Sequence, residues 1–204
     1  MPRARKSADP SPPAPPVRSS DPKTRLIAAA LELAATKGWR EIGMGEIARE
    51  AGLSLGEAYA VYRNKACLLA GVTRHINETV LAGAEPEGSP RERLFELFMR
   101  RFDALRPHRA AIKAILRGSI GDPAAILGVP ATLNAMAWML EGAGISAAGW
   151  RGHARCLALT GAYAAVFRTF LEDDSDDLAK TMAALDRRLK VRAFGGAAAA
   201  GTAA

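Results

Sequence analysis

The sequence predicts an all-α protein with a small N-terminal helical domain and a larger C-terminal helical bundle. Three observations predict this fold class. Alanine far outnumbers valine and isoleucine in the 204-residue chain, and a large β-sheet needs such β-branched residues. Apolar residues recur at the three- and four-residue spacing of a helix face along most of the chain. Hydrophobic residues make up 49% of the sequence, which is enough for a substantial core.

The two ends of the chain differ in composition from the rest. Residues 1–20 contain six prolines and almost no large apolar side chain, and proline removes the backbone donors that a helix needs. We therefore expect a disordered, Pro-rich arm over residues 1–20. Residues 193–204 consist mostly of glycine and alanine, which predicts a low-complexity tail.

Four helices are predicted in the first domain, which spans residues 21–83. Their expected positions are residues 22–37, 44–50, 54–60 and 64–81. Asp21 followed by Pro22 is typical of an N-cap and a first helical position, and Gly38 is typical of the residue after a helix end.

The second domain is predicted over residues 84–192, after a break at residues 83–90 that contains glycine and proline. Its helix candidates are residues 91–105, 107–120, 123–142, 147–172 and 176–192. Pro130 is expected to break or kink the third of these, because an interior proline removes a backbone hydrogen bond. The aspartates before the last helix are Asp173, Asp174, Asp176 and Asp177. We interpret them as charges that favour the positive end of its dipole.

The segment from Met44 to Tyr59 has the pattern of a helix-turn-helix. Gly52 favours the left-handed backbone conformation that turns the chain sharply after the first helix. Ser54 and Glu57 have the spacing of a capping box, which opens the second helix. In proteins with this layout, the second helix enters the major groove of DNA.

The run from Ala30 to Leu69 resembles the N-terminal domain of the TetR family of transcriptional regulators. The residues that carry the resemblance are Lys37-Gly38-Trp39, Ile47-Ala48, Ala51-Gly52-Leu53-Ser54, Gly56, Tyr59, Tyr62 and Asn64-Lys65. The resemblance implies a DNA-binding N-terminal domain. It also implies an all-α C-terminal domain that binds a small ligand and forms a homodimer.

By this resemblance, the third helix is the recognition helix. The candidate DNA-binding residues are Gly43, Ser54, Leu55, Gly56, Glu57, Ala58, Tyr59, Tyr62, Arg63 and Lys65. Those expected to face base edges or flanking phosphates are Ser54, Leu55, Glu57 and Ala58. Those expected to contact backbone phosphates are Tyr59, Arg63 and Lys65.

The chain departs from the usual family pattern at three of these positions. The family usually has threonine or serine at Gly43, lysine at Leu55 and threonine at Glu57. Leu55 therefore removes a cation from the reading face, and Glu57 either accepts from a cytosine amino group or serves only in the capping box. Residues 25–83 carry seven basic and six acidic side chains. Their net charge of +1 is small for a DNA reader.

The C-terminal domain contains two candidate surfaces. Large, soft side chains either form plain core or line an apolar effector pocket between helices; they are Met99, Phe102, Met136, Trp138, Met139, Tyr163 and Phe167. Small residues in the helix at 154–170 permit close approach of another helix. By resemblance, this helix and the last one form a two-fold dimer interface. Its candidate residues are Ala158, Gly161, Ala162, Ala165, Leu185 and Leu189.

The predicted function is that of a ligand-responsive repressor. Its expected partners are double-stranded operator DNA, a second copy of the chain and a small apolar effector. An alternative comes from residues 169–175 and 185–189, which resemble the end of a TetR-like accessory family of ubiquinone biosynthesis. Those proteins bind lipid or isoprenoid in the C-terminal domain and have lost DNA reading.

Other functions are disfavoured by the sequence. Residues 52–56 match the GxSxG pattern of hydrolases, but a helix precedes them where that motif needs a strand. The histidines and the two cysteines lack ligand spacing. We therefore predict no enzyme activity, no cofactor and no metal. The apolar stretch at residues 156–167 is shorter than the roughly 20 residues of a membrane span, so we expect a soluble, cytoplasmic protein.

Overall fold

The computed structural model describes residues 21–83, 87–120 and 129–190. Within these ranges the chain forms α-helices, one short 3₁₀ helix and connections, with no strand, so the predicted all-α class is confirmed. The predicted arm (1–20) and tail (193–204) lie outside the described residues.

The predicted N-terminal helices are confirmed. They are α1 (Pro22–Lys37), α2 (Met44–Glu50), α3 (Leu55–Val61) and α4 (Lys65–Leu81). Asp21 accepts a hydrogen bond from the backbone N–H of Lys23 at the start of α1. Asn64 accepts one from the N–H of Cys67 at the start of α4. These side chains satisfy backbone donors that have no partner inside a helix, and this sets where each helix begins.

The described C-terminal helices follow the prediction. They are α5 (Pro90–Leu105), η1 (Arg106–His108), α6 (Arg109–Ser119), α7 (Val129–Gly142), α8 (Gly149–Glu172) and α9 (Ala179–Leu189). The predicted break or kink at Pro130 stays a prediction, because residues 121–128 before it are not described. In the described helix α7, Pro130 lies in the first turn. A proline there removes no intrahelical hydrogen bond. The part of the predicted helix at 123–128 lies outside the described residues.

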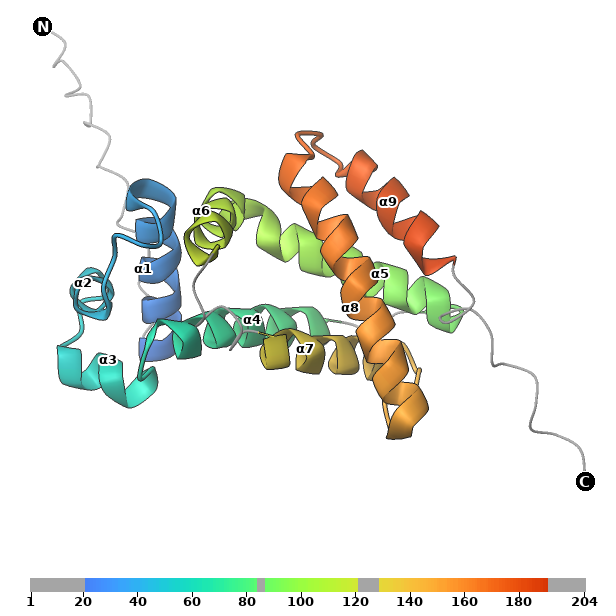
Figure 1. Cartoon of the computed structure of the whole chain (residues 1–204), viewed down its shortest axis with the longest axis horizontal. Helices are drawn as coiled ribbons and strands as arrows, with labels where there is room; N and C mark the ends of the chain where they lie inside the picture. The colour runs from blue at the N-terminus through green and yellow to red at the C-terminus, as the bar shows by residue number, and fades with distance from the viewer. Residues whose placement is uncertain (1–20, 84–86, 121–128, 191–204) are drawn as a thin grey trace, which may run out of the picture.

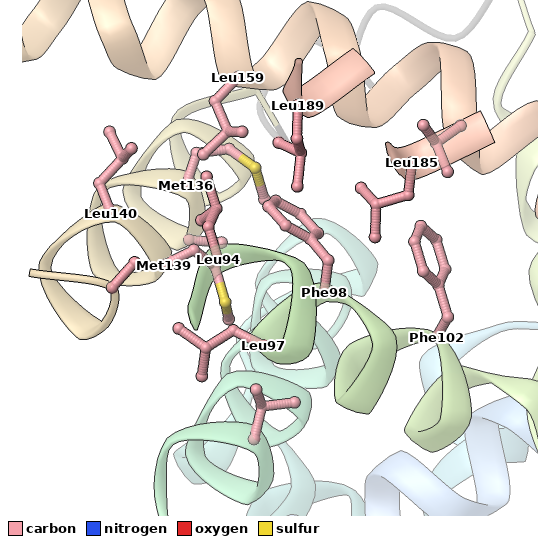
Figure 2. Packing of buried hydrophobic residues seen from close by; sticks show 14 of the residues in the cluster. Leu94, Leu97, Phe98, Phe102, Met136, Met139, Leu140, Leu159, Leu185 and Leu189 are labelled. Carbon is pink, nitrogen blue, oxygen red and sulfur yellow. The ribbon is translucent and has the colours of Figure 1, made fainter. Parts of the chain in front are cut away.

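Two hydrophobic cores meet within α4, which runs along the molecule (Figure 1). Leu68 of α4 packs into the first core, with α1, α2, α3 and Ala111 of α6. Ile76 and Val80, further along α4, pack into the second core with α5, α7, α8 and α9. Figure 2 shows side chains of α5, α7 and α9 converging in the second core. The cores therefore meet before residue 83, where we predict the domain boundary.

Helix α6 of the C-terminal domain holds the N-terminal domain by packing against α1. The guanidinium of Arg40, in the α1–α2 connection, donates from Nε to the carbonyl oxygen of Gly118 at 2.9 Å and from Nη2 to that of Ile120. Gly118 also touches Trp39, since a Cβ at Gly118 would lie 2.9 Å from Trp39 Cβ. A displacement at the end of α6 therefore acts directly on the α1–α2 connection.

One of the aspartates before α9, Asp173, forms specific hydrogen bonds and does more than interact with the helix dipole. Asp173 is fully buried, and its Oδ2 accepts from the backbone N–H and the hydroxyl of Thr181, both at 2.7 Å. Its Oδ1 accepts from Ser175. Burial pushes the pKa of Asp173 upward, but these hydrogen bonds outweigh burial and hold the pKa well below its ordinary value. Asp173 thus caps α9 from outside the helix.

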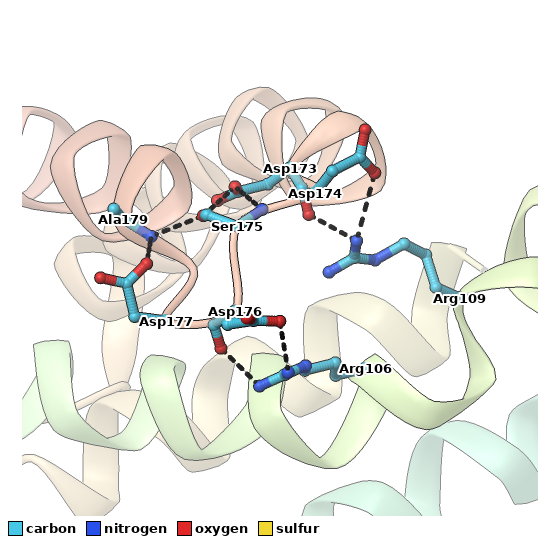
Figure 3. Close-up of polar contacts among 8 residues, drawn as sticks. All are labelled: Arg106, Arg109, Asp173, Asp174, Ser175, Asp176, Asp177 and Ala179. Atoms are coloured by element: carbon cyan, nitrogen blue, oxygen red, sulfur yellow. Dashed lines mark hydrogen bonds and ion pairs between the residues drawn. The ribbon is translucent and has the colours of Figure 1, made fainter.

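The loop between α8 and α9 is also held by Arg106 of η1 and Arg109 of α6 (Figure 3). Arg106 donates to the backbone carbonyl of Asp176 at 2.7 Å, and Arg109 donates to that of Asp173. Arg109 also lies 3.9 Å from the carboxylate of Asp174. These contacts link the α8–α9 loop to the junction of η1 and α6.

Candidate nucleic-acid interface

Helix α3 lies at one end of the molecule, next to α2 (Figure 1). The turn between them passes through Gly52, whose φ of +65° is the left-handed conformation predicted from the sequence. The carbonyl oxygen of Gly52 accepts a hydrogen bond from Arg25 Nη2 of α1 at 2.7 Å. This contact fixes the turn to the body of the domain, so α3 is presented in a defined orientation.

The start of α3 is the predicted capping box. Glu57 N–H donates to Ser54 Oγ at 3.2 Å, and Glu57 Oε2 accepts from Ser54 N–H at 2.8 Å. Hydrogen bonds from the Ser54 side chain and backbone lower the pKa of Glu57. Of the two roles considered for Glu57, the structure shows the capping role. Its carboxylate is bound to Ser54 in the free protein.

The outer face of α3 carries two large apolar side chains one helical turn apart. Leu55 and Tyr59 are each 62% exposed, and they border an apolar hollow of about 380 Å³ that Met44 also lines. Gly56 and Arg63 are exposed as well. Most of the predicted face of α3 therefore does point outward.

Ala58 is placed differently from the expectation. It is fully buried in the first core, so it cannot face base edges or phosphates. The helix period does not explain this burial, because residues three apart, such as Leu55 and Ala58, lie on neighbouring parts of a helix surface. The packing of α3 into the first core buries Ala58.

Two further predicted DNA contacts point inward. The ammonium of Lys65 donates to the carbonyl oxygens of Trp39 and Ile42, the latter at 2.9 Å, and lies 4.4 Å from the Trp39 ring centroid. Lys65 thus binds the α1–α2 connection to the start of α4, and its ammonium group does not point toward a phosphate. The ring of Tyr62 lies half-buried against Gly71 of α4, and burial raises its pKa. Tyr62, the C-cap residue of α3, thus holds the end of α3 against α4.

Three contributors to this site were not predicted. Arg49, in the last turn of α2, is exposed and forms no ion pair within the described part of the chain. It is therefore free to approach a phosphate, as Arg63 is. Gly71 accommodates Tyr62, and Arg25 holds the turn at Gly52. Neither an arginine nor a single glycine in a helix marks a particular role by its residue type, so only their position in the fold distinguishes these three.

Gly43 is the N-cap of α2, as predicted, and supplies no side-chain hydrogen bond. A Cβ at this position would have no heavy atom within 4 Å. We expect Gly43→Ser to raise the free energy of unfolding by a few tenths of a kcal/mol, because its hydroxyl can accept from the free N–H groups that begin α2. Urea unfolding measures the change. Gly43→Ala, which lacks the hydroxyl, should lower stability, and equal effects of the two variants would contradict the capping explanation.

The residues predicted to line an effector pocket do not surround one described hollow. Phe102, Met136 and Met139 are fully buried core (Figure 2), and the Phe102 ring lies 5.0 Å from that of Phe170. Trp138 is 56% exposed on α7, so it lies outside the core. Met99, Tyr163 and Phe167 are half-buried at the edge of the second core.

The predicted dimer residues also separate into two groups. Leu185 and Leu189 are buried in the core of their own chain (Figure 2), so they cannot form the surface of an interface. The α8 residues remain on the surface. Ala158 and Gly161 are exposed, and Ala162 and Ala165 are half-buried. The sequence period identified an apolar stripe on α9, but this stripe faces inward.

Residues 26–72 match the family described as "Bacterial regulatory proteins, tetR family". The N-terminal domain belongs to the TetR family. This match includes α2, the turn at Gly52 and α3, the elements whose geometry is described above. No curated protein matches the chain significantly.

Solved structures extend the likeness to the C-terminal domain. A TetR transcriptional regulator from Nitrosomonas europaea is 22% identical with a TM-score of 0.66, over 82% of this chain and 95% of that one. A TetR regulator from a Rhodococcus species is 22% identical with a TM-score of 0.62, over 84% and 96%. NalD from Pseudomonas aeruginosa, the secondary repressor of the MexAB-OprM multidrug efflux pump, is 18% identical with a TM-score of 0.50, over 82% and 93%. The whole described chain thus has the TetR fold. Its described helices include none that is both long and apolar enough to cross a membrane.

Proposed function

We propose that this TetR-family chain represses transcription by binding operator DNA as a homodimer, and that a small ligand in its C-terminal domain releases the DNA. The observation that carries the proposal is the presentation of α3. This helix is capped by Ser54 and Glu57, fixed through Gly52 and Arg25, and exposes Leu55 and Tyr59 at the end of the molecule. A short, exposed, rigidly held helix fits the major groove.

The exposed residues of this site have different roles in DNA binding. Leu55 offers an apolar contact that suits the methyl group of thymine. Gly56 has no side chain, so the α3 backbone can approach the duplex closely. The Tyr59 hydroxyl and the guanidinium groups of Arg49 and Arg63 bind backbone phosphates, which position the helix without reading sequence. In a homodimer, the two copies of α3 lie about 34–36 Å apart, one turn of DNA.

The homodimer forms through the exposed face of α8 together with α9. Ala158 and Gly161 allow another helix to approach closely, while Leu157 and Met182 are 51% and 40% exposed and supply apolar area. Since this face also includes a hollow between α8 and α9, a partner helix can pack into it. Two-fold symmetry then places both recognition helices on one side of the assembly.

Ligand response travels through α6. Arg40 bonds the α1–α2 connection to the last residues of α6, so a ligand that displaces α6 also displaces the domain that carries α3. Only a ligand that prefers the displaced state can shift this equilibrium.

We expect Tyr59→Ala to weaken binding to DNA of every sequence by at least about 10-fold, because a hydrogen bond to a charged group contributes about 1.5–3 kcal/mol, a homodimer has two copies of Tyr59, and a phosphate carries no base identity. Duplexes selected from a random library, and random duplexes, would be titrated by fluorescence anisotropy. Trp138→Ala removes an exposed aromatic from α7, away from α3, and should leave DNA binding unchanged. A loss confined to the selected sequence would contradict the phosphate role.

Arg63→Ala should reduce the salt dependence of DNA binding, whereas Tyr59→Ala should not. A neutralised phosphate contributes roughly −0.9 to the slope of log K against log salt concentration, and a homodimer has two copies of Arg63. Titrations from about 50 to about 200 mM salt measure the slope. An unchanged slope for Arg63→Ala would remove this residue from the interface.

One observation favours a second function, that of a lipid- or isoprenoid-binding accessory protein without DNA reading. The reading face of α3 has the apolar Leu55 where the family usually has lysine, and Glu57 keeps its negative charge while it caps the helix. If library selection enriches no sequence and no duplex binds at about 50 mM salt, this second function replaces the first.

A further inference from the structure

A buried arginine lies in the C-terminal domain, at the contact of three helices. Arg101 of α5 is 4% exposed, and its Nη1 donates to Oδ1 of Asn77 on α4, which is itself 8% exposed. Its Nε donates to the hydroxyl of Tyr163 on α8 at 3.2 Å. Both partners are neutral. Within the described part of the chain, no carboxylate pairs with Arg101.

This pairing differs from that of other arginines of the C-terminal domain. Arg91, Arg100 and Arg109 each lie beside an aspartate or a glutamate. A guanidinium stays charged at any ordinary pH, and burying a charge without an opposite charge is strongly unfavourable. Arg101 is the more buried group but lacks the anion. Among the described residues, the buried positive charge of Arg101 therefore has no opposite charge beside it.

Three hydrogen-bond donors remain unused at this cluster. In the described residues, Arg101 Nη2, Asn77 Nδ2 and the Tyr163 O–H donate to no protein atom. The first carries positive charge, and all three belong to residues already held together by hydrogen bonds. Donors fixed in this way suit an oxyanion, which accepts several hydrogen bonds and supplies the missing charge.

The surroundings of the donors are aromatic. The Tyr163 ring lies 5.4 Å from Arg101 Cζ, 5.7 Å from the Phe98 ring and 5.2 Å from the Phe167 ring. Tyr163 and Phe167 are only half-buried at the edge of the second core. The partly exposed Tyr163 ring thus offers apolar surface beside the cation, and Phe167 extends this surface, for the rest of a ligand.

We propose that Arg101, Asn77 and Tyr163 form the anchor for an anionic effector, an apolar molecule that ends in a carboxylate or another oxyanion. This inference rests on the proposed ligand-responsive function and names its ligand class. Arg101 binds the head group, and the rings of Tyr163 and Phe167 contact the apolar body. The same cluster joins α4, α5 and α8, so a bound anion acts on α4, which contributes to both cores.

The test measures binding to the full chain by calorimetry without DNA. The probes are the straight-chain carboxylates from butanoate to dodecanoate, 1-naphthoate, the corresponding neutral alcohols, and decyl phosphate. At least one carboxylate or the alkyl phosphate should bind about 10- to 100-fold more tightly than its alcohol, the range expected for charged hydrogen bonds. The comparison of decanoate with decyl phosphate distinguishes the two head groups. Acetate and inorganic phosphate should bind far more weakly, because they lack an apolar body.

Variants separate an anchor from a general charge effect. Arg101→Met should reduce the affinity for the anion to that for the alcohol, and Tyr163→Phe should reduce it several-fold. Arg100→Met removes the same charge one residue away, from the pair with Glu96, and should leave the preference unchanged. If Arg101→Met does not fold, Arg101→Lys and Tyr163→Phe provide the same comparison, since each keeps the bulk but loses hydrogen bonds to the anion.

Equal affinity of the wild type for anions and alcohols would overturn the inference. An equal loss in Arg100→Met and Arg101→Met would overturn it too. Because the measurement contains no DNA, a chain that binds anions but not operator refutes the repressor alone. A chain that binds operator but shows no preference for anions refutes the anchor alone.

Discussion

Asp173→Asn is expected to lower the free energy of unfolding by about 3 kcal/mol, because a buried carboxylate that accepts several hydrogen bonds loses both its charge and an acceptor. The two carboxylate oxygens accept from Ser175 and Thr181. An amide keeps the shape of the side chain but turns one oxygen into a donor. That donor then faces the N–H and hydroxyl of Thr181 or those of Ser175, which leaves polar groups unsatisfied.

The pH dependence of stability gives a second readout for Asp173. Its pKa in the folded chain is below its ordinary value, so the unfolded chain takes up a proton first as the pH falls. The stabilisation is complete above the unfolded value of about 3.9 and is lost as the pH decreases from there toward the folded value. Asp173→Asn should remove this contribution to acid sensitivity.

The measurement is urea unfolding of wild type and variant between about pH 7 and about pH 3. Asp174→Asn is the matched control. The carboxylate of Asp174 is exposed and 3.9 Å from Arg109, so its loss should change stability by less than about 1 kcal/mol. Similar losses in both variants would show that the loop depends on total charge and not on the cap that Asp173 provides.

Gly71→Ala is expected to lower the free energy of unfolding by about 2 kcal/mol, the typical cost of overpacking. A Cβ at Gly71 would lie 2.4 Å from Tyr62 Oη and 2.5 Å from two ring carbons, so the Tyr62 ring must move away from α4. Because Tyr62 ends α3 as its C-cap, α3 moves with it. We therefore expect DNA affinity to fall about 10-fold or more, a change of about 1.4 kcal/mol.

A double variant tests whether the clash with Tyr62 is the cause. Tyr62→Leu removes the ring, so adding Gly71→Ala to it should cost much less than adding Gly71→Ala to wild type. Gly45→Ala changes another helical glycine, in α2, with nothing within 4 Å of the added Cβ. It should raise stability by roughly 0.5–1 kcal/mol, as expected from helix propensity. If Gly71→Ala raised stability in the same way, the contact of the Tyr62 ring with Gly71 would not support α3.

The sequence predicted where helices begin and end more reliably than which way their residues face. Caps are local signals, so Asp21, Ser54 and Asn64 could be identified without tertiary information. Ala58 and Leu185 lie on helices that were predicted correctly, yet both are buried where we expected a binding surface. A helix period reveals an apolar stripe, but not whether that stripe meets its own chain or a partner.

Charged residues showed the same limit. Glu57 was assigned its partner Ser54 correctly, because both lie in one turn. Lys65 and Asp173 were recognised as charges near helix ends, but their partners lie in other elements. The partners of Arg101 lie on two further helices, 24 and 62 residues away in the chain. No spacing rule connects such residues, so the sequence offered no signal for this cluster.

The sequence alone therefore determined the all-α class, the positions of the helices and the helix-turn-helix, because capping, turn chemistry and helix period act over a few neighbouring residues. Only the tertiary structure decided that Ala58 and Tyr62 support α3 from within, that Lys65 bonds to the α1–α2 connection, and that Arg101 is buried beside neutral partners. Burial and pairing depend on how helices far apart in the chain pack together. Packing of this kind is a property of the whole fold, which no local pattern contains.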